Sequence, residues 1–394
     1  MIYKRYFWWL LPFFVVTSGN FSPFRVGPIL PIFWLLGAYT VGERKLLKSF
    51  FLRNGYIAYI MIALVICAVF VTLNTTSSYG ISGDEFAGAV HPIVYSLMSL
   101  FRSLFVIFVL IVLCRGEMTS YKRWFDALIF SYCVTLIPLY AQAILYFFFG
   151  YEVGYLFPTE TGMRYGGFIG EPQTISAWLC CIFFCLMRSD RVNSNSNSKF
   201  ALYSSILLAL ALTQSTAWIL SFFIFMLTRT KWWFFLFVTI FSAVTGIVAQ
   251  VSEKIFADIF IISERSVTIA AGFELFTKNL VDVLFGYGAG MTPYLITGTE
   301  IFAEYTSFDL SSLGRQTVMN SYFELICEFG LIGAALYSFL LVKACNIVTL
   351  RQIFLLLPIL IGIFGVSGGF SSGYFLIGVP MLMNLSKTKN VVGA

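Results

Sequence analysis

The sequence predicts an all-α polytopic integral membrane protein with about twelve membrane-spanning helices. Of its 394 residues, 59% are hydrophobic and only 11% are charged, and the mean hydropathy is +0.86. A soluble domain carries roughly 25% charged residues, so this composition indicates a chain that lies mostly in lipid. Apolar runs recur along the whole sequence and are separated by polar segments that hold most of the charge.

Twelve apolar runs support this expectation, and several are shorter than the ~20 residues that a span needs. In order they are 6–18, 27–41, 54–74, 92–114, 124–149, 173–187, 200–213, 215–229, 232–252, 319–344, 352–368 and 371–386. The two runs between 200 and 229 could instead form one long helix. Charge favours two short helices. If the chain turns at Thr213-Gln214-Ser215-Thr216, all basic clusters lie on the same side of the membrane, and without this turn they do not.

The distribution of Lys and Arg also predicts the orientation of the chain. Eighteen of the 25 basic residues lie in clusters that this turn places on the cytoplasmic side, together with both termini. The loops 75–91, 150–172 and 253–318 then lie outside. Because the net charge of +6 reflects this orientation, we expect contacts with membrane lipid and no nucleic-acid partner.

The segment 253–318 is the longest polar interruption within one integral membrane domain that covers 1–394. A loop of this length beside such apolar helices is usually functional rather than a simple connection. The helix that follows it carries Glu324 and Glu328, one turn apart on the same face. These two carboxylates could act as an acid and base pair, or they could be interior groups satisfied by their neighbours.

Metal chemistry has little support in the sequence. His91 is the only histidine, and the eight cysteines lie mostly within apolar runs and form no C-x-x-C pair. Packed thiols explain such cysteines better than disulfides or a zinc site. We therefore predict no metal and no cofactor.

Seven basic residues lie off the cytoplasmic face and form the shortlist for function. They are Arg25, Arg102, Arg164, Lys254, Arg265, Lys278 and Arg315. Arginine matches phosphate oxygens with two parallel hydrogen bonds, so several arginines at one cleft would suit a diphosphate. Ordinary ion pairs with acidic loop residues are the alternative. Arg102 lies inside an apolar run, where a charge is costly and marks a functional site by default. A partner such as Glu324 or a lipid phosphate would explain it equally well.

Arg164 begins the segment Arg164-Tyr165-Gly166-Gly167-Phe168-Ile169-Gly170-Glu171-Pro172-Gln173. Its glycines let the backbone approach a ligand, and Pro172 can open the helix that follows. Glu171 would lie beside the start of that helix. It could make a favourable contact with the helix dipole, or it could orient or deprotonate a sugar hydroxyl.

Three segments together resemble the superfamily of bacterial O-antigen polymerases and ligases. They are Arg164 to Pro172, Arg265 followed by Gly286-x-Gly288-x-Gly290, and Asn320 followed by Gly330-Leu331-Ile332-Gly333. The resemblance covers most of the chain, because the helix number, the short helix pair and the large late loop are similar too. It implies a membrane glycosyltransferase architecture of the GT-C type in the bacterial inner membrane, with the active site facing the periplasm.

In the ligase branch a histidine directly precedes the asparagine position, and here that residue is Met319. The resemblance therefore favours the polymerase branch. Such an enzyme joins oligosaccharide repeat units carried on undecaprenyl diphosphate, releases undecaprenyl diphosphate, and works with a chain-length regulator protein. It would require no nucleotide sugar, metal or cofactor.

The resemblance and the outer position of the arginines assign roles to individual residues. Arg164 and Arg265 would hold the diphosphate, and Glu171 would activate the acceptor hydroxyl. The remaining predicted substrate-binding residues are Arg102, Tyr165, Gly288, Arg315, Asn320 and Glu324. A ligase that transfers to lipid A-core and a lipid-linked oligosaccharide flippase are the alternatives. A flippase would be expected to carry its charges along a cavity between two related halves, and no internal repeat is evident.

Overall fold

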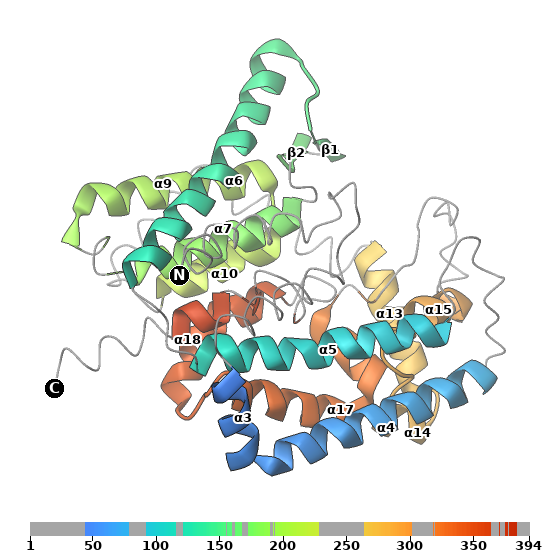
Figure 1. Cartoon of the computed structure of the whole chain (residues 1–394). Helices are drawn as coiled ribbons and strands as arrows, with labels where there is room; N and C mark the ends of the chain where they lie inside the picture. Colours follow the sequence, from blue (N-terminus) through green and yellow to red (C-terminus); the bar gives the residue numbers. More distant parts are fainter. Residues whose placement is uncertain are drawn as a thin grey trace.

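The fold is known from a computed structural model of the chain (Figure 1). It describes residues 44–78, 92–115, 121–154, 156–159, 162–167, 172–189, 192, 194–227, 264–301, 318, 320–363, 370, 375–376 and 378–383, and they are mostly helical. Four helices in this part are long and apolar enough to cross a membrane. They are α4 (Gly55–Ser78), α5 (Pro92–Arg115), α6 (Tyr121–Phe149) and α17 (Ser321–Ala344).

Shorter elements complete the described fold. The helices are α3 (Arg44–Arg53), α7 (Pro172–Met187), α9 (Ser196–Thr213), α10 (Thr216–Leu227), α13 (Glu264–Thr277), α14 (Leu280–Phe285), α15 (Thr292–Leu295), the 3-10 helix η3 (Ile296–Gly298) and α18 (Leu350–Gly362). Two strands, β1 (Leu156–Thr159) and β2 (Gly162–Tyr165), pair antiparallel with Phe157 opposite Arg164.

The prediction of a helical membrane protein is confirmed, whereas the number of twelve spans stays a prediction. The apolar runs 6–18, 27–41 and 232–252 lie outside the described residues, and 371–386 is described only in part. The predicted division of 200–229 is confirmed. Helix α9 ends at Thr213, Gln214 adopts a left-handed conformation with φ 50°, and α10 begins at Thr216.

One end of the helical bundle gathers basic residues. Lys45, Lys48 and Arg53 are exposed on α3. Arg115, at the end of α5, donates a hydrogen bond of 2.7 Å to the carbonyl of Lys343 near the end of α17, and its guanidinium lies 4.7 Å from the ring centre of Phe50. We call this the basic end. In Figure 1, α3 marks it, and α13 and α15 lie toward the opposite end of α4 and α5.

The positive-inside rule predicts that the basic end faces the cytoplasm. Cysteines introduced at Ser196 and Glu300 in a cysteine-free background should therefore react with a membrane-impermeant maleimide from opposite sides. Both positions are exposed, so lack of access would not explain a negative result. Glu300→Cys should label in intact cells, and Ser196→Cys should label only in inverted vesicles. Labelling of both from one side would contradict the predicted orientation.

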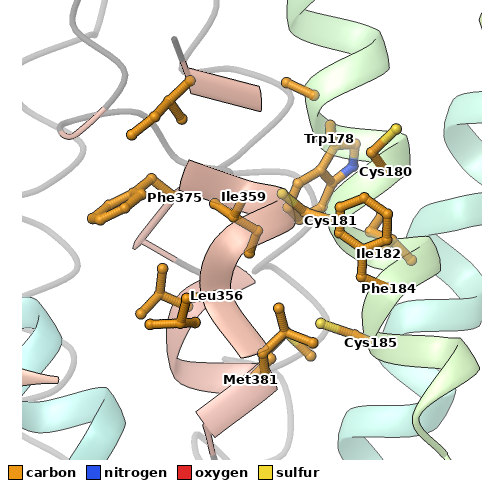
Figure 2. Close-up of a cluster of buried hydrophobic side chains, with 14 of the residues drawn as sticks. Trp178, Cys180, Cys181, Ile182, Phe184, Cys185, Leu356, Ile359, Phe375 and Met381 are labelled. Atoms are coloured by element: carbon orange, nitrogen blue, oxygen red, sulfur yellow. The ribbon is translucent and has the colours of Figure 1, made fainter. Parts of the chain in front are cut away.

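Helix α7 forms the centre of the upper half of Figure 1 and is buried along almost its whole length. It is apolar on all faces, which is the pattern of a helix surrounded by other helices. Figure 2 shows Trp178, Cys181 and Cys185 of α7 facing Ile359 of α18 and Met381. Because α7 is held on several sides, its first turn offers a rigid support for the residues around it.

Candidate functional site

Helix α17 is broken at Gly330, which has the non-helical angles φ 65° and ψ 179°. Gly330 is the tenth residue of the helix, about 14 Å along its axis from the first. A break at this depth leaves carbonyl groups without their helical donors, and lipid cannot supply donors. The segment after α14 supplies them: Tyr287 N–H donates to the Cys327 carbonyl (3.0 Å) and Gly288 N–H to the Glu328 carbonyl (2.9 Å).

The glycines of 286–290 are required by this close approach. A Cβ on Gly286 would lie 2.5 Å from the backbone nitrogen of Gly330 and 2.6 Å from the Glu328 carbonyl oxygen. A Cβ on Gly288 would collide with the hydroxyl of Thr72 on α4. Part of the predicted outer loop 253–318 therefore packs back against the middle of a candidate membrane span.

Two buried carboxylates lie beside the break, and together with Thr292 and with Arg102, which acts on Glu328 electrostatically, they form what we call the glutamate cluster: Arg102, Thr292, Glu324 and Glu328. The Thr292 hydroxyl donates to Oε1 of Glu328 at 3.2 Å, and the Gly290 N–H donates to the same carboxylate. Arg102 attracts this carboxylate electrostatically, and Glu324 repels it. Glu324 and Glu328 are each only 8% exposed, whereas Arg102 is exposed.

Polar groups of α4 and α5 line the same region. The hydroxyls of Thr72 and Ser96 are 2.8 Å apart, and both residues are buried. A Cβ on Gly290 would lie 2.8 Å from Cβ of Ser99, so α5 touches the glycine segment directly.

Two of the predicted substrate-binding residues have structural contacts here. Gly288 donates its backbone N–H to the Glu328 carbonyl. The Asn320 side chain caps α17, because its Oδ1 accepts from the backbone N–H groups of Tyr322 (3.1 Å) and Phe323 (3.0 Å).

Helices α13 and α14 brace the glycine segment from the other side. The Tyr287 hydroxyl donates to the Leu275 carbonyl and lies 3.0 Å from Oδ2 of Asp282. Burial raises the pKa of the Asp282 carboxyl, and hydrogen bonds from Tyr287 and Asn279 oppose this rise. Tyr287 and Tyr294 are buried, so they pack the segment against its neighbours.

A second group of side chains lies where α7 meets the turn between α9 and α10, and we call it the arginine cluster: Arg164, Ser176, Thr213 and Ser215. Arg164 Nε donates to the Thr213 carbonyl at 3.1 Å. The Ser176 hydroxyl donates to the Thr213 hydroxyl at 2.6 Å. The predicted residue Tyr165 is buried, and its ring lies 6.0 Å from that of Tyr146. It therefore anchors the strand that carries Arg164.

Helices α7 and α10 run parallel, so both N-termini lie at the arginine cluster. The Cys180 thiol contacts the Trp218 carbonyl, and further along Phe184 stacks on Phe225 with ring centres 4.5 Å apart. Helix N-termini attract anions through free N–H groups and the helix dipole. Ser215 directly precedes α10, and its hydroxyl is buried without a hydrogen-bond partner among the described residues. Buried hydroxyls in this state are uncommon in folded proteins, so Ser215 stands out among the residues of the cluster.

The arginine cluster and the start of α17 are linked through the end of α18. A Cβ on Gly362 at the end of α18 would collide with the Trp218 ring in the first turn of α10. Two residues earlier, the Leu360 carbonyl accepts a 2.5 Å hydrogen bond from the Tyr322 hydroxyl in the first turn of α17. The end of α18 thus connects the start of α10 to the start of α17.

The structure brings together only part of the predicted site. Arg102, Gly288, Asn320 and Glu324 surround the start of α17, whereas Arg164 and Tyr165 belong to the arginine cluster. Glu171, Arg315, Met319 and the side chain of Arg265 lie outside the described residues, so their predicted roles stay predictions.

Sequence reasoning did not single out Thr292, Ser176, Thr213 or Ser215 as site residues. The sequence predicts a helix break at residues 213–216, and this break is the signal that could have drawn attention to Thr213 and Ser215. Among the described residues, no group of three or more metal-binding side chains occurs. The sequence matches no protein-family model and no curated protein significantly.

Proposed function

We propose that this protein is an O-antigen polymerase, a membrane glycosyltransferase that joins oligosaccharide repeat units carried on undecaprenyl diphosphate at the periplasmic face of the bacterial inner membrane. The arginine cluster is the observation that carries the proposal. It combines an arginine, two parallel helix N-termini and a buried hydroxyl without a described partner. These are the groups that would receive a diphosphate.

The chemistry of glycosyl transfer explains why such a site matters. Displacement at an anomeric carbon leaves negative charge on the departing diphosphate oxygen. Preorganised donors stabilise this charge most where water is excluded. The Arg164 guanidinium is held by Thr213, and Thr213 is in turn held by Ser176 on the buried helix α7. Little reorganisation is then needed as the charge develops.

Gene deletion distinguishes the polymerase from the other reactions that the sequence allows. In the native host, loss of a polymerase should leave lipopolysaccharide that carries a single repeat unit, because the ligase still transfers one unit. Electrophoresis and staining of lipopolysaccharide would reveal this pattern. Loss of all repeat units would contradict the proposal and indicate a ligase or a flippase, and an unchanged ladder would remove the protein from this pathway.

A lipid-oligosaccharide flippase is the second candidate, and the broken helix α17 is the observation in its favour. Transporters often bind substrates at helices that are interrupted within the membrane. Purified protein in proteoliposomes separates the two candidates. A polymerase should extend lipid-linked repeat units supplied on the side of its active site, whereas a flippase should only move them across the bilayer.

A further inference from the structure

We propose that Arg115 and Lys343 bind the phosphate of an anionic phospholipid at the basic end, where α5 and α17 end side by side. The acyl chains of this lipid lie along the exposed face of α4. The inference is independent of the proposed polymerase reaction, because it concerns a lipid of the surrounding membrane and not the lipid-linked substrate.

Contacts between the helix ends hold the two cations close together. Arg115 donates a 2.7 Å hydrogen bond to the Lys343 carbonyl, and its guanidinium lies on the ring of Phe50. The Lys343 ammonium lies 5.6 Å from the ring centre of Phe339. The Tyr56 ring, at the start of α4, lies 6.4 Å from that same ring. The cations of α5 and α17 thus border the first turn of α4.

Neither cation has an anionic partner in the part of the chain that the structure describes. Arg115 and Lys343 form no ion pair with a described carboxylate, and Arg115 Nε is buried there without a hydrogen-bond acceptor. A guanidinium and an ammonium each carry several N–H donors, and the bond to the Lys343 carbonyl uses one of them. A phosphate would supply both the missing charge and the missing acceptor oxygens.

The local charge remains positive after the helix dipoles are included. The C-terminal ends of α5 and α17 each carry about half a negative charge, whereas Arg115 and Lys343 each carry a full positive charge. Helix α3 lies beside the end of α5 and the start of α4 (Figure 1), and it contains basic but no acidic residues. An anion is therefore attracted to this surface.

The adjoining apolar surface favours a lipid over a free anion. From Tyr56 to Leu73, α4 exposes large apolar side chains at every third or fourth position, which is one face of the helix. This face is about 25 Å long and covers most of the ~30 Å hydrocarbon core of a bilayer. A phosphate joined to long acyl chains fits the cations and the apolar face together. The exposed residues are Tyr56, Tyr59, Ile62, Ile66, Phe70 and Leu73.

Thermal unfolding of the purified protein in a non-ionic detergent tests this site. Phosphatidylglycerol should raise the wild-type Tm, because a ligand that binds only the folded state stabilises it. Phosphatidylcholine with the same acyl chains lacks the net charge, and inorganic phosphate lacks the chains, so both should have little effect. No rise with phosphatidylglycerol, or an equal rise with either comparison ligand, would overturn the inference.

Variants locate the binding surface. Lys343→Gln should weaken the apparent affinity for phosphatidylglycerol about fivefold, and Lys343→Gln combined with Arg115→Gln about 30-fold. Arg115→Lys should retain most of the affinity, because it keeps the charge. Lys48→Gln is the matched control, since it removes an exposed cation of α3 outside the site.

The comparison of Lys343→Gln with Lys48→Gln is decisive on its own if Arg115→Gln does not fold. A loss confined to Lys343→Gln supports a defined lipid site. An equal loss in both variants would show a general attraction to the basic end, and wild-type affinity in Lys343→Gln would show that this ammonium does not contact the lipid. Either of these two results would overturn the inference.

Discussion

Replacement of Arg164 by alanine is expected to abolish long polysaccharide while the protein still inserts into the membrane. Arg164 is the charged member of the arginine cluster, and its removal leaves two helix N-termini without their fixed cation. Removing one preorganised donor for a developing anion typically costs about 100-fold to 1,000-fold in rate. Arg164→Lys should recover only part of the rate, because lysine lacks the planar fork that binds two oxygens.

Two measurements check this expectation. Lipopolysaccharide ladders report polymerisation in cells, and the thermal unfolding of purified protein with inorganic pyrophosphate reports anion binding without chemistry. Pyrophosphate should raise the wild-type Tm and have little effect on Arg164→Ala. Lys48→Ala is the matched control, because it removes an exposed cation at the basic end, outside the arginine cluster. A normal ladder and a normal Tm shift in Arg164→Ala would remove this residue from the site.

Replacement of Gly286 by alanine is expected to destabilise the protein by about 3 kcal/mol or more. Gly286 has φ +74°, which strains any residue with a Cβ, and the added carbon would lie 2.5 Å from the Gly330 nitrogen. Neither backbone can yield, because Tyr287 and Gly288 donate to the carbonyls beside the break. We therefore expect separation of the glycine segment from α17 and exposure of those carbonyls to lipid.

Gly150→Ala separates the two causes of this effect. Gly150 has a similar φ of +67°, but a Cβ there would meet nothing within 4 Å. Gly298→Ala has open space and no positive φ, so it should be close to neutral. Unfolding followed by intrinsic fluorescence in detergent should rank the variants Gly298, Gly150 and Gly286 in order of increasing loss. Equal losses at Gly150 and Gly286 would show that the close contact with α17 contributes nothing.

The described helices were largely predictable, because apolar runs and basic clusters are local signals. The division at Gln214 followed from charge alone, and the structure confirms it. From the sequence, the glycines of 286–290 stand out only through the family resemblance, which does not explain why glycine is needed there. Their partner is Gly330, and only the folded chain shows that the two backbones meet.

The candidate site was less predictable because its members come from distant parts of the chain. The sequence offers Glu324 as a possible partner of Arg102, but the hydrogen bonds that Thr292 and Gly290 donate to Glu328 join distant segments and are evident only in the folded chain. Ser215 resembles any serine before a helix, and only the folded chain shows that its hydroxyl is buried with no hydrogen-bond partner among the described residues. Asn320 was predicted to bind substrate, and its visible contacts are those of a helix cap.

The order of synthesis gives the break in α17 a role in biogenesis. The ribosome makes residues 286–290 before it makes Gly330, so the docking surface exists when α17 enters the membrane. Until the two meet, the carbonyls of Cys327 and Glu328 face lipid at a cost of several kcal/mol. Insertion of α17 and folding of the segment before it should therefore occur as one event. A chain that lacks residues 286–290 would keep the break in α17 without its donors, and we expect it to become a substrate for membrane quality-control proteases.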